Sequence, residues 1–214
     1  MAVGLVAGIV WLSSGASSRP AARPGRAVTT TTRATGSGAP VTLAFGGDVH
    51  FEGQEAARLA DDPTTALAPL ATLFAHSDLA MVNIESAVTM GNGCPQAQSK
   101  QYVFHAPPSA YVALKSAGVT VATQANNHGE DCGPRGLDES MAAARAAAFP
   151  VLGIGGNADQ AFAPFRTTIR GQRVAIIAAT DVLDTNLVEA WTATTSQAGV
   201  ASSLDPTRLV AAVQ

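Results

Sequence analysis

Charged and aromatic residues are scarce in this sequence of 214 residues: Asp, Glu, Lys and Arg make up 14% of it, and Phe, Trp and Tyr 5%. Apolar residues make up 47%. This composition excludes a disordered, highly charged tail protein, because such chains lack the apolar surface that offsets the entropy of ordering. The length predicts one folded domain of about 150 to 200 residues with a single core.

Cysteine is also rare. Cys94 and Cys132 are the only two, and the absence of a Cys-x-x-Cys pair argues against a thiolate zinc site. An even number of cysteines is compatible with an oxidising compartment. Two interpretations stay open at this point: a Cys94–Cys132 disulfide that ties two loops together, or two unpaired buried thiols.

The charges are unevenly distributed along the chain. Residues 1–40 hold four of the 13 basic residues and no acid, so the remainder carries 9 basic against 16 acidic residues, a balance of −7. An acidic body argues against a nucleic-acid partner, because phosphate binding needs clustered Lys and Arg on the fold itself. It is better suited to a site for cations.

The first forty residues do not resemble part of a folded domain. Residues 2–12 form an apolar run, too short for the roughly 20 residues of a membrane-spanning helix but long enough for the core of a signal peptide. Residues 13–40 are rich in Ser, Thr, Pro and Arg, which is typical of a flexible linker. We interpret residues 1–40 as a signal or anchor remnant and a disordered linker, with a merely disordered start as the alternative. The protein is then secreted or anchored outside the cytoplasm, and this segment makes its only membrane contact.

Residues 41–214 alternate strands and helices. Apolar runs predict buried strands, and helical spacing with Pro, Gly and Asp signals predicts helices between them. The expected strands cover 41–45, 79–84, 119–123 and 151–154; the expected helices cover 62–76, 107–117 and 134–148. A hairpin or an edge pair is expected around Gly171, and a last helix is expected to begin at Asp205-Pro206 and to stop at Gln214, as in a truncated chain. The predicted fold class is α/β, with a mainly parallel sheet covered on both faces.

Polar side chains follow each of the first three predicted strands, where ligands bind in such sheets. In an extended backbone, residues two apart point to the same side, so Asp48 can converge with His50, and Asn83 with Glu85. The third strand is followed by Asn126, Asn127 and His128. Carboxylate, amide and imidazole donors suit manganese, iron, zinc or magnesium. One such group could be a simple turn or a solvated loop end, but three in succession favour a metal site.

These residues resemble a known family. The matching blocks are Gly47-Asp-Val-His50, Asn83-x-Glu85, Ala125-Asn-Asn-His128 followed by Asp131 and Gly133, and Gly153-Ile-Gly-Gly-Asn157. Together they resemble the capsule-synthesis CapA family, named for poly-γ-glutamate capsule production and similar to the calcineurin-like metallophosphoesterases. The resemblance covers roughly residues 42–179 and implies a layered, metallophosphoesterase-like α/β sandwich.

The resemblance also implies roles for individual residues. Asp48, His50, Glu85 and Asn127 are similar to the family's metal ligands, and the resemblance implies a site for two divalent ions of manganese, iron, zinc or magnesium. His128 resembles the histidine that meets the leaving oxygen of a phosphoester. We place Asn83, Asn126 and Asp131 around this set as supporting residues.

Two departures from the family pattern affect the functional prediction. Cys132 stands where the family has an aromatic residue, and no histidine follows His128, whereas the family supplies further histidines from later strands. We therefore expect a metal-dependent hydrolase only if a longer chain supplies them. Its expected substrate is a phosphoester or an anionic polymer linkage, and its expected partners are proteins of envelope biosynthesis. The alternatives are a non-enzymatic accessory or anchoring factor for a surface polymer, and an inactive fragment.

Overall fold

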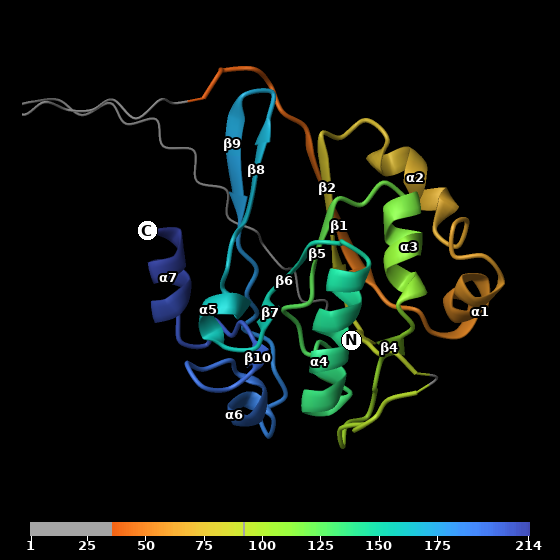
Figure 1. Cartoon of the computed structure of the whole chain (residues 1–214), viewed down its shortest axis with the longest axis vertical. Coiled ribbons are helices and arrows are strands. Elements are labelled where there is room, and N and C mark those ends of the chain that lie inside the picture. The colour runs from red at the N-terminus through yellow and green to blue at the C-terminus, as the bar shows by residue number, and fades with distance from the viewer. Residues whose placement is uncertain (1–35, 92) are drawn as a thin grey trace, which may run out of the picture. The chain divides into compact units, whose positions relative to one another are not determined.

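The computed structural model describes residues 36–91 and 93–214, so most of the predicted signal and linker segment lies outside the described residues. The central sheet has the strand order β1-β2-β5-β6, and each neighbouring pair is parallel. Its strands are β1 (Leu43–Val49), β2 (Leu79–Ile84), β5 (Val121–Thr123) and β6 (Val151–Leu152). The predicted α/β class with a mainly parallel sheet is confirmed, and the arrangement is consistent with the metallophosphoesterase-like fold that the resemblance implies (Figure 1).

Helices and short strand pairs surround this sheet. The helices are α1 (Gly53–Asp61), α2 (Ala68–Phe74), α3 (Ser109–Ser116), α4 (Gly133–Ala146), α5 (Ala158–Ala161), α6 (Val188–Trp191) and α7 (Thr207–Val213). Within the described residues, three strand pairs stand apart from the main sheet: β3 (Ala87–Val88) with β4 (His105–Ala106), β7 (Ile154–Gly155) with β10 (Gly199–Val200), and β8 (Phe165–Ile169) with β9 (Gln172–Ile176). In Figure 1, α1, α2 and α3 lie together on one side, and α5, α6 and α7 lie together on the other.

Strand β2 shows how the sheet divides the apolar core. Ala80, Val82 and Ile84 pack with residues of α1, α2 and α3, whereas Leu79 packs with Val121 and with the β8–β9 hairpin. Alternate residues of a strand point to opposite faces, so a strand covered on both faces needs apolar residues at nearly every position. This explains why β2 was predicted to its exact residues from an apolar run.

The first strand differs from its prediction in two ways. It is not buried, because β1 lies at the edge of the sheet and Phe45 is 59% exposed. It also does not stop at Gly46, since the strand continues to Val49 with an irregularity in register between Phe45 and Asp48. A bulge of this kind re-aims the following side chains, so it places Asp48 beside Asn83 on β2.

Two other predictions were wrong in their boundaries. Helix α2 begins at Ala68 rather than at Asp62, because the Asp62 carboxylate accepts hydrogen bonds from Thr64 and Thr65 within a turn of its own. The predicted strand 151–154 is split into β6 and β7 by Gly153, whose φ is +84°. A Cβ at this position would lie 2.3 Å from the Ala125 Cβ, so the close approach of the two loops requires glycine.

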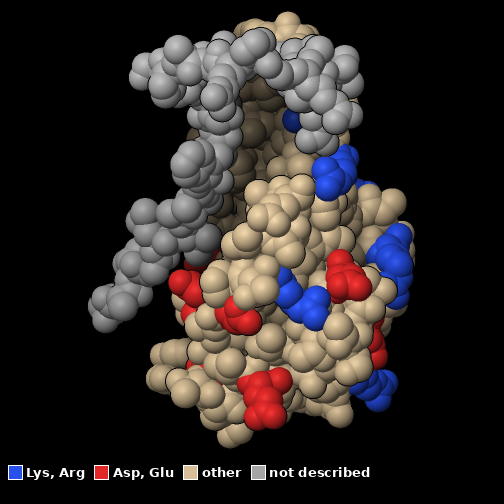
Figure 2. Space-filling model, turned by 90° about the vertical axis from the view of Figure 1, so that its left-hand side faces the viewer, with Lys and Arg blue, Asp and Glu red and all other residues tan. Residues whose placement is uncertain are grey.

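The surface of the described residues carries both signs of charge. Figure 2 shows acidic and basic side chains interspersed over one face. Among the described residues, no helix combines the length and apolar character needed to cross a bilayer. Residues 36–40, which we assigned to the linker, contact the β8–β9 hairpin: the Gln172 amide donates to the Ala39 carbonyl at 3.0 Å, and Ser37 donates to the Arg170 carbonyl.

Candidate functional site

The carboxyl ends of β1, β2 and β5 bring three predicted residues into one chain of hydrogen bonds. The Asn83 amide donates to the Asp48 carboxylate at 2.7 Å, and the Asn126 amide donates to Asn83 Oδ1 at 2.8 Å. Asn126 also donates to the Ile84 carbonyl at 2.9 Å, and its Oδ1 accepts from the His128 backbone N–H at 2.8 Å. The two asparagines therefore fix the orientation of Asp48 and the start of the loop that carries His128.

Glu85 follows β2 and lies among the other ionisable groups of this edge. Partial burial raises its pKa, and the nearby Asp48 carboxylate raises it further, whereas His128 and His50 act in the opposite direction. The Glu85 carboxylate lies 3.9 Å from His128 Nε2. A carboxylate that is half-buried beside another carboxylate is poorly compensated, which is the electrostatic situation that a bound cation relieves.

His128 is held by the buried side chain of Asp131. Its Nδ1 lies 2.6 Å from Asp131 Oδ2, and Asp131 is 0% exposed. Because the carboxylate accepts a hydrogen bond from Nδ1–H, Nε2 is the ring nitrogen left to exchange a proton with a ligand. The Phe104 ring stacks on His128 with centroids 4.2 Å apart and on His50 with centroids 4.9 Å apart.

The donor set has the chemistry of a site for a divalent cation, since Asp48, His50, Glu85 and His128 offer carboxylate oxygens and imidazole nitrogens. Asn127, the fifth predicted member, is half-buried, and none of the described contacts includes its side-chain amide. Within the described residues, no three His, Cys, Asp or Glu side chains lie close enough to hold a metal ion as they stand. The residues therefore fit a cation in their chemistry, but the described positions do not form a complete set of ligands.

A disulfide between Cys94 and Cys132 joins the loop after β3 to the loop that carries Asp131. The Gln98 backbone N–H donates to the Asp131 carbonyl at 2.9 Å, and the Phe104 N–H donates to Asp131 Oδ2 at 2.6 Å. Residues 94–104 are therefore fastened along the Asp131 segment. Of the two interpretations that the sequence left open for the cysteines, the structure contains the disulfide.

Sequence reasoning missed two residues of this site. Phe104 stacks between two candidate histidines, and the Lys100 ammonium forms an ion pair with Asp131 at 2.7 Å. Both lie in the loop between β3 and β4, two strands too short to be recognised from an apolar pattern. The one available signal was the rarity of lysine, because Lys100 and Lys115 are the only two in the chain.

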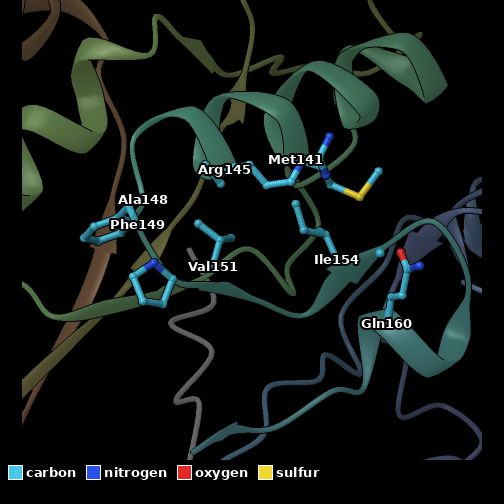
Figure 3. A pocket seen from close by; sticks show the side chains of 10 residues that line it. Met141, Arg145, Ala148, Phe149, Val151, Ile154 and Gln160 are labelled. Carbon is cyan, nitrogen blue, oxygen red and sulfur yellow. The ribbon is translucent and has the colours of Figure 1, made fainter.

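A hollow in the described part of the chain touches the candidate site. It has a volume of about 440 Å³, and Asp48 lines it together with Gly46, Gly47 and apolar residues of α2. Another hollow, of about 380 Å³, lies between α4 and the strands β6 and β7, where Met141, Val151 and Ile154 line it (Figure 3). None of the predicted site residues lines this second pocket.

The comparison with family models gives the same result as the residue pattern. The model described as bacterial capsule synthesis protein PGA_cap matches residues 42–213, which include every candidate site residue and both cysteines. The chain belongs to the PGA_cap family. This membership confirms the resemblance to the CapA family, associates the protein with capsule synthesis, and suggests a role at the cell envelope. A search of curated proteins found no match to this PGA_cap chain.

Proposed function

We propose that this PGA_cap protein is a metal-dependent hydrolase of a phosphoester or a related linkage in an anionic envelope polymer. The observation that carries the proposal is the arrangement of His128: a buried carboxylate occupies its Nδ1 at 2.6 Å, and its Nε2 lies 3.9 Å from Glu85 among the candidate ligands. A histidine held in this way at one nitrogen can deliver a proton from the other. We propose that it protonates the leaving oxygen.

The metal ligands in this proposal are Asp48, His50, Glu85 and Asn127. When bound, divalent cations supply Lewis-acid stabilisation of the charge that develops on the phosphoryl oxygens. Asn83 and Asn126 orient Asp48 through their amides. The stacked Phe104 ring covers one face of His128 and limits the access of water to it.

The proposal includes export. The apolar run at residues 2–12 and the Arg-rich linker support a secreted or membrane-anchored protein outside the cytoplasm, where the Cys94–Cys132 disulfide is chemically favoured. In that compartment the protein would meet an anionic polymer and the proteins that assemble it.

A second candidate function is a non-enzymatic accessory or anchoring role in polymer assembly. One observation favours it: within the described residues no three ligands converge closely enough to hold a metal. The two candidates differ in what they need, because an accessory role requires neither bound metal nor His128.

The test is metal analysis and hydrolysis of phosphomonoester and phosphodiester substrates by the complete protein with Mn²⁺, Zn²⁺ or Mg²⁺. We expect Asp48→Ala and His50→Ala to lower metal content, and His128→Ala to abolish turnover with metal retained. His76→Ala, at an exposed histidine after α2, is the matched control and should change neither. The hydrolase proposal would be refuted if metal content were unchanged in both ligand variants, or if turnover survived the loss of His128.

A further inference from the structure

Lys100 is a nearly buried cation that the proposed function does not yet use. Its side chain is 6% exposed, and its ammonium lies 2.7 Å from Asp131 Oδ1 and 3.0 Å from Asp184 Oδ2. It also donates to the Asn127 carbonyl and lies 4.8 Å from the ring centroid of Trp191. A charged amine is costly to bury unless it is paired. These contacts provide that pairing, so Lys100 differs from a solvated surface lysine.

The contact with Asp131 gives Lys100 a route to His128. The two carboxylate oxygens of Asp131 have different partners. Oδ1 accepts from Lys100, whereas Oδ2 accepts from the Phe104 N–H and contacts His128 Nδ1, both at 2.6 Å. An ammonium on Oδ1 fixes the rotation of the carboxylate plane. It also gives a fully buried carboxylate a charged hydrogen-bond partner.

The position of Lys100 is itself enforced by the chain around it. The disulfide fixes Cys94, the Gln98 N–H donates to the Asp131 carbonyl, and the Phe104 N–H donates to the Asp131 carboxylate. These three anchors lie on both sides of Lys100 in the sequence. These anchors fix the backbone around Lys100, so the position of its ammonium beside Asp131 does not depend on the flexible side chain alone.

We propose that Lys100 is a positioning residue for the hydrolytic reaction: by fixing the Asp131 carboxylate, it holds His128 as the Nδ1–H tautomer with Nε2 directed to the candidate ligands. This inference rests on the proposed function for its catalytic meaning. The tautomer itself does not depend on any activity.

Asp184 separates this role from a purely structural one. Lys100 also joins the β3–β4 loop to Asp184 and Trp191, which belong to the later part of the chain. If Lys100 only held the two segments together, losing either of its carboxylate partners would disturb His128 to the same extent. A positioning lysine acts through Asp131, so replacing Asp184 leaves His128 unchanged.

The direct experiment is NMR of the ¹⁵N-labelled full chain at a pH where the imidazole is neutral, because the ring-nitrogen shifts report the tautomer. We expect His128 to be in the Nδ1–H form in the wild type, in Lys100→Arg and in Asp184→Asn, and to be a mixture of tautomers in Lys100→Met. Lys115→Met removes the other lysine, which is exposed, and serves as the matched control. If Lys100→Met does not fold, Lys100→Gln takes its place with the same expected mixture.

A wild-type tautomer in the folded Lys100 variant, or equal disturbance by Asp184→Asn, overturns the proposal. In the hydrolysis assay, Lys100→Met should lower kcat by about tenfold or more with KM little changed, as expected when a residue that orients a catalytic histidine is lost. If the wild type proves inactive, the hydrolase proposal fails, while the NMR result still decides whether Lys100 positions His128.

Discussion

At the scale of single residues, Glu130 is the most strongly perturbed acid of the site loop. It is 2% exposed, and one carboxylate oxygen has no hydrogen-bond partner among the described residues. Burial raises its pKa to about 8, with a further contribution from the Asp138 carboxylate. The folded protein therefore binds a proton here that the unfolded chain releases near its ordinary pKa of 4.5.

This difference makes a prediction about the pH dependence of stability. Below pH 4.5 both states are protonated, and between 4.5 and 8 only the folded state keeps the proton, so Glu130 lowers stability progressively as the pH rises. We expect the stability of Glu130→Gln relative to the wild type to increase by on the order of 3 to 5 kcal/mol as the pH rises from 4.5 to 8. Urea unfolding at several pH values measures the gain. Glu55→Gln, at an exposed position on α1, should show none; a constant difference between Glu130→Gln and wild type at every pH would contradict the assignment.

Asn126 is the residue whose hydrogen bonds do most to shape the site. It is 5% exposed, donates to Asn83 and to the Ile84 carbonyl, and accepts from the His128 N–H. Asn126→Ala leaves a buried carbonyl and a buried N–H without partners, which we expect to cost on the order of 2 to 4 kcal/mol of unfolding free energy. The neighbouring Asn127→Ala is the control for denaturant unfolding and should cost much less. Equal losses in the two variants would show that the buried network is not what stabilises the loop.

At the scale of elements, the accuracy of the sequence predictions depends on which forces placed each element. Strand β2 is covered on both faces and was predicted residue for residue, because burial alone dictates its apolar run. Helix α1 was missed: only Leu59 of its nine residues is buried, so the apolar pattern over it is weak. The edge strand β1 was mistaken for a buried one, because a strand's neighbours cannot be read from its own residues.

The loop between β3 and β4 is held in place by a disulfide and by hydrogen bonds to Asp131 rather than by regular secondary structure. The Cys94–Cys132 disulfide closes a segment with a sequence separation of 38 residues. In the chain-entropy account, closing a loop of this length stabilises the fold by about 4 kcal/mol. We expect Cys94→Ala/Cys132→Ala, or reduction of the wild type, to cost up to this amount in denaturant unfolding. Reductant should leave the double variant unaffected, and a wild type that is equally stable with and without reductant would show that the bridge does not constrain the chain.

At the scale of the whole molecule, the site is assembled from segments that no local pattern connects. The order of parallel strands brings Asp48, Asn83 and Asn126 together, and this was predictable because carboxyl ends of neighbouring parallel strands share one edge. Lys100, Phe104 and Asp184 reach the same region from irregular loops. Their placement depends on the disulfide and on long-range packing, which hydrophobic periodicity does not encode.

The assembled site makes a prediction about the stability of the whole domain. A ligand that binds only the folded state stabilises it by RT ln(1 + [L]/Kd), about 2.7 kcal/mol at a concentration of 100 Kd, which corresponds to roughly 5 to 10 °C in Tm for a domain of this size. We therefore expect saturating Mn²⁺, Zn²⁺ or Mg²⁺ to raise Tm by this amount and a chelator to reverse it. The raised pKa of Glu85 means that a proton competes with the cation, so the increase should shrink as the pH falls.

Two variants make the thermal measurement specific to the proposed ligands. Asp48→Asn and Glu85→Gln each remove one carboxylate charge while keeping its shape, so each should abolish the metal-dependent rise in Tm. Asp205→Asn, at an exposed turn before α7, removes the same charge far along the chain and should preserve it. A rise that persists in both ligand variants would place the cation elsewhere on the acidic body, because net charge alone would then account for the stabilisation.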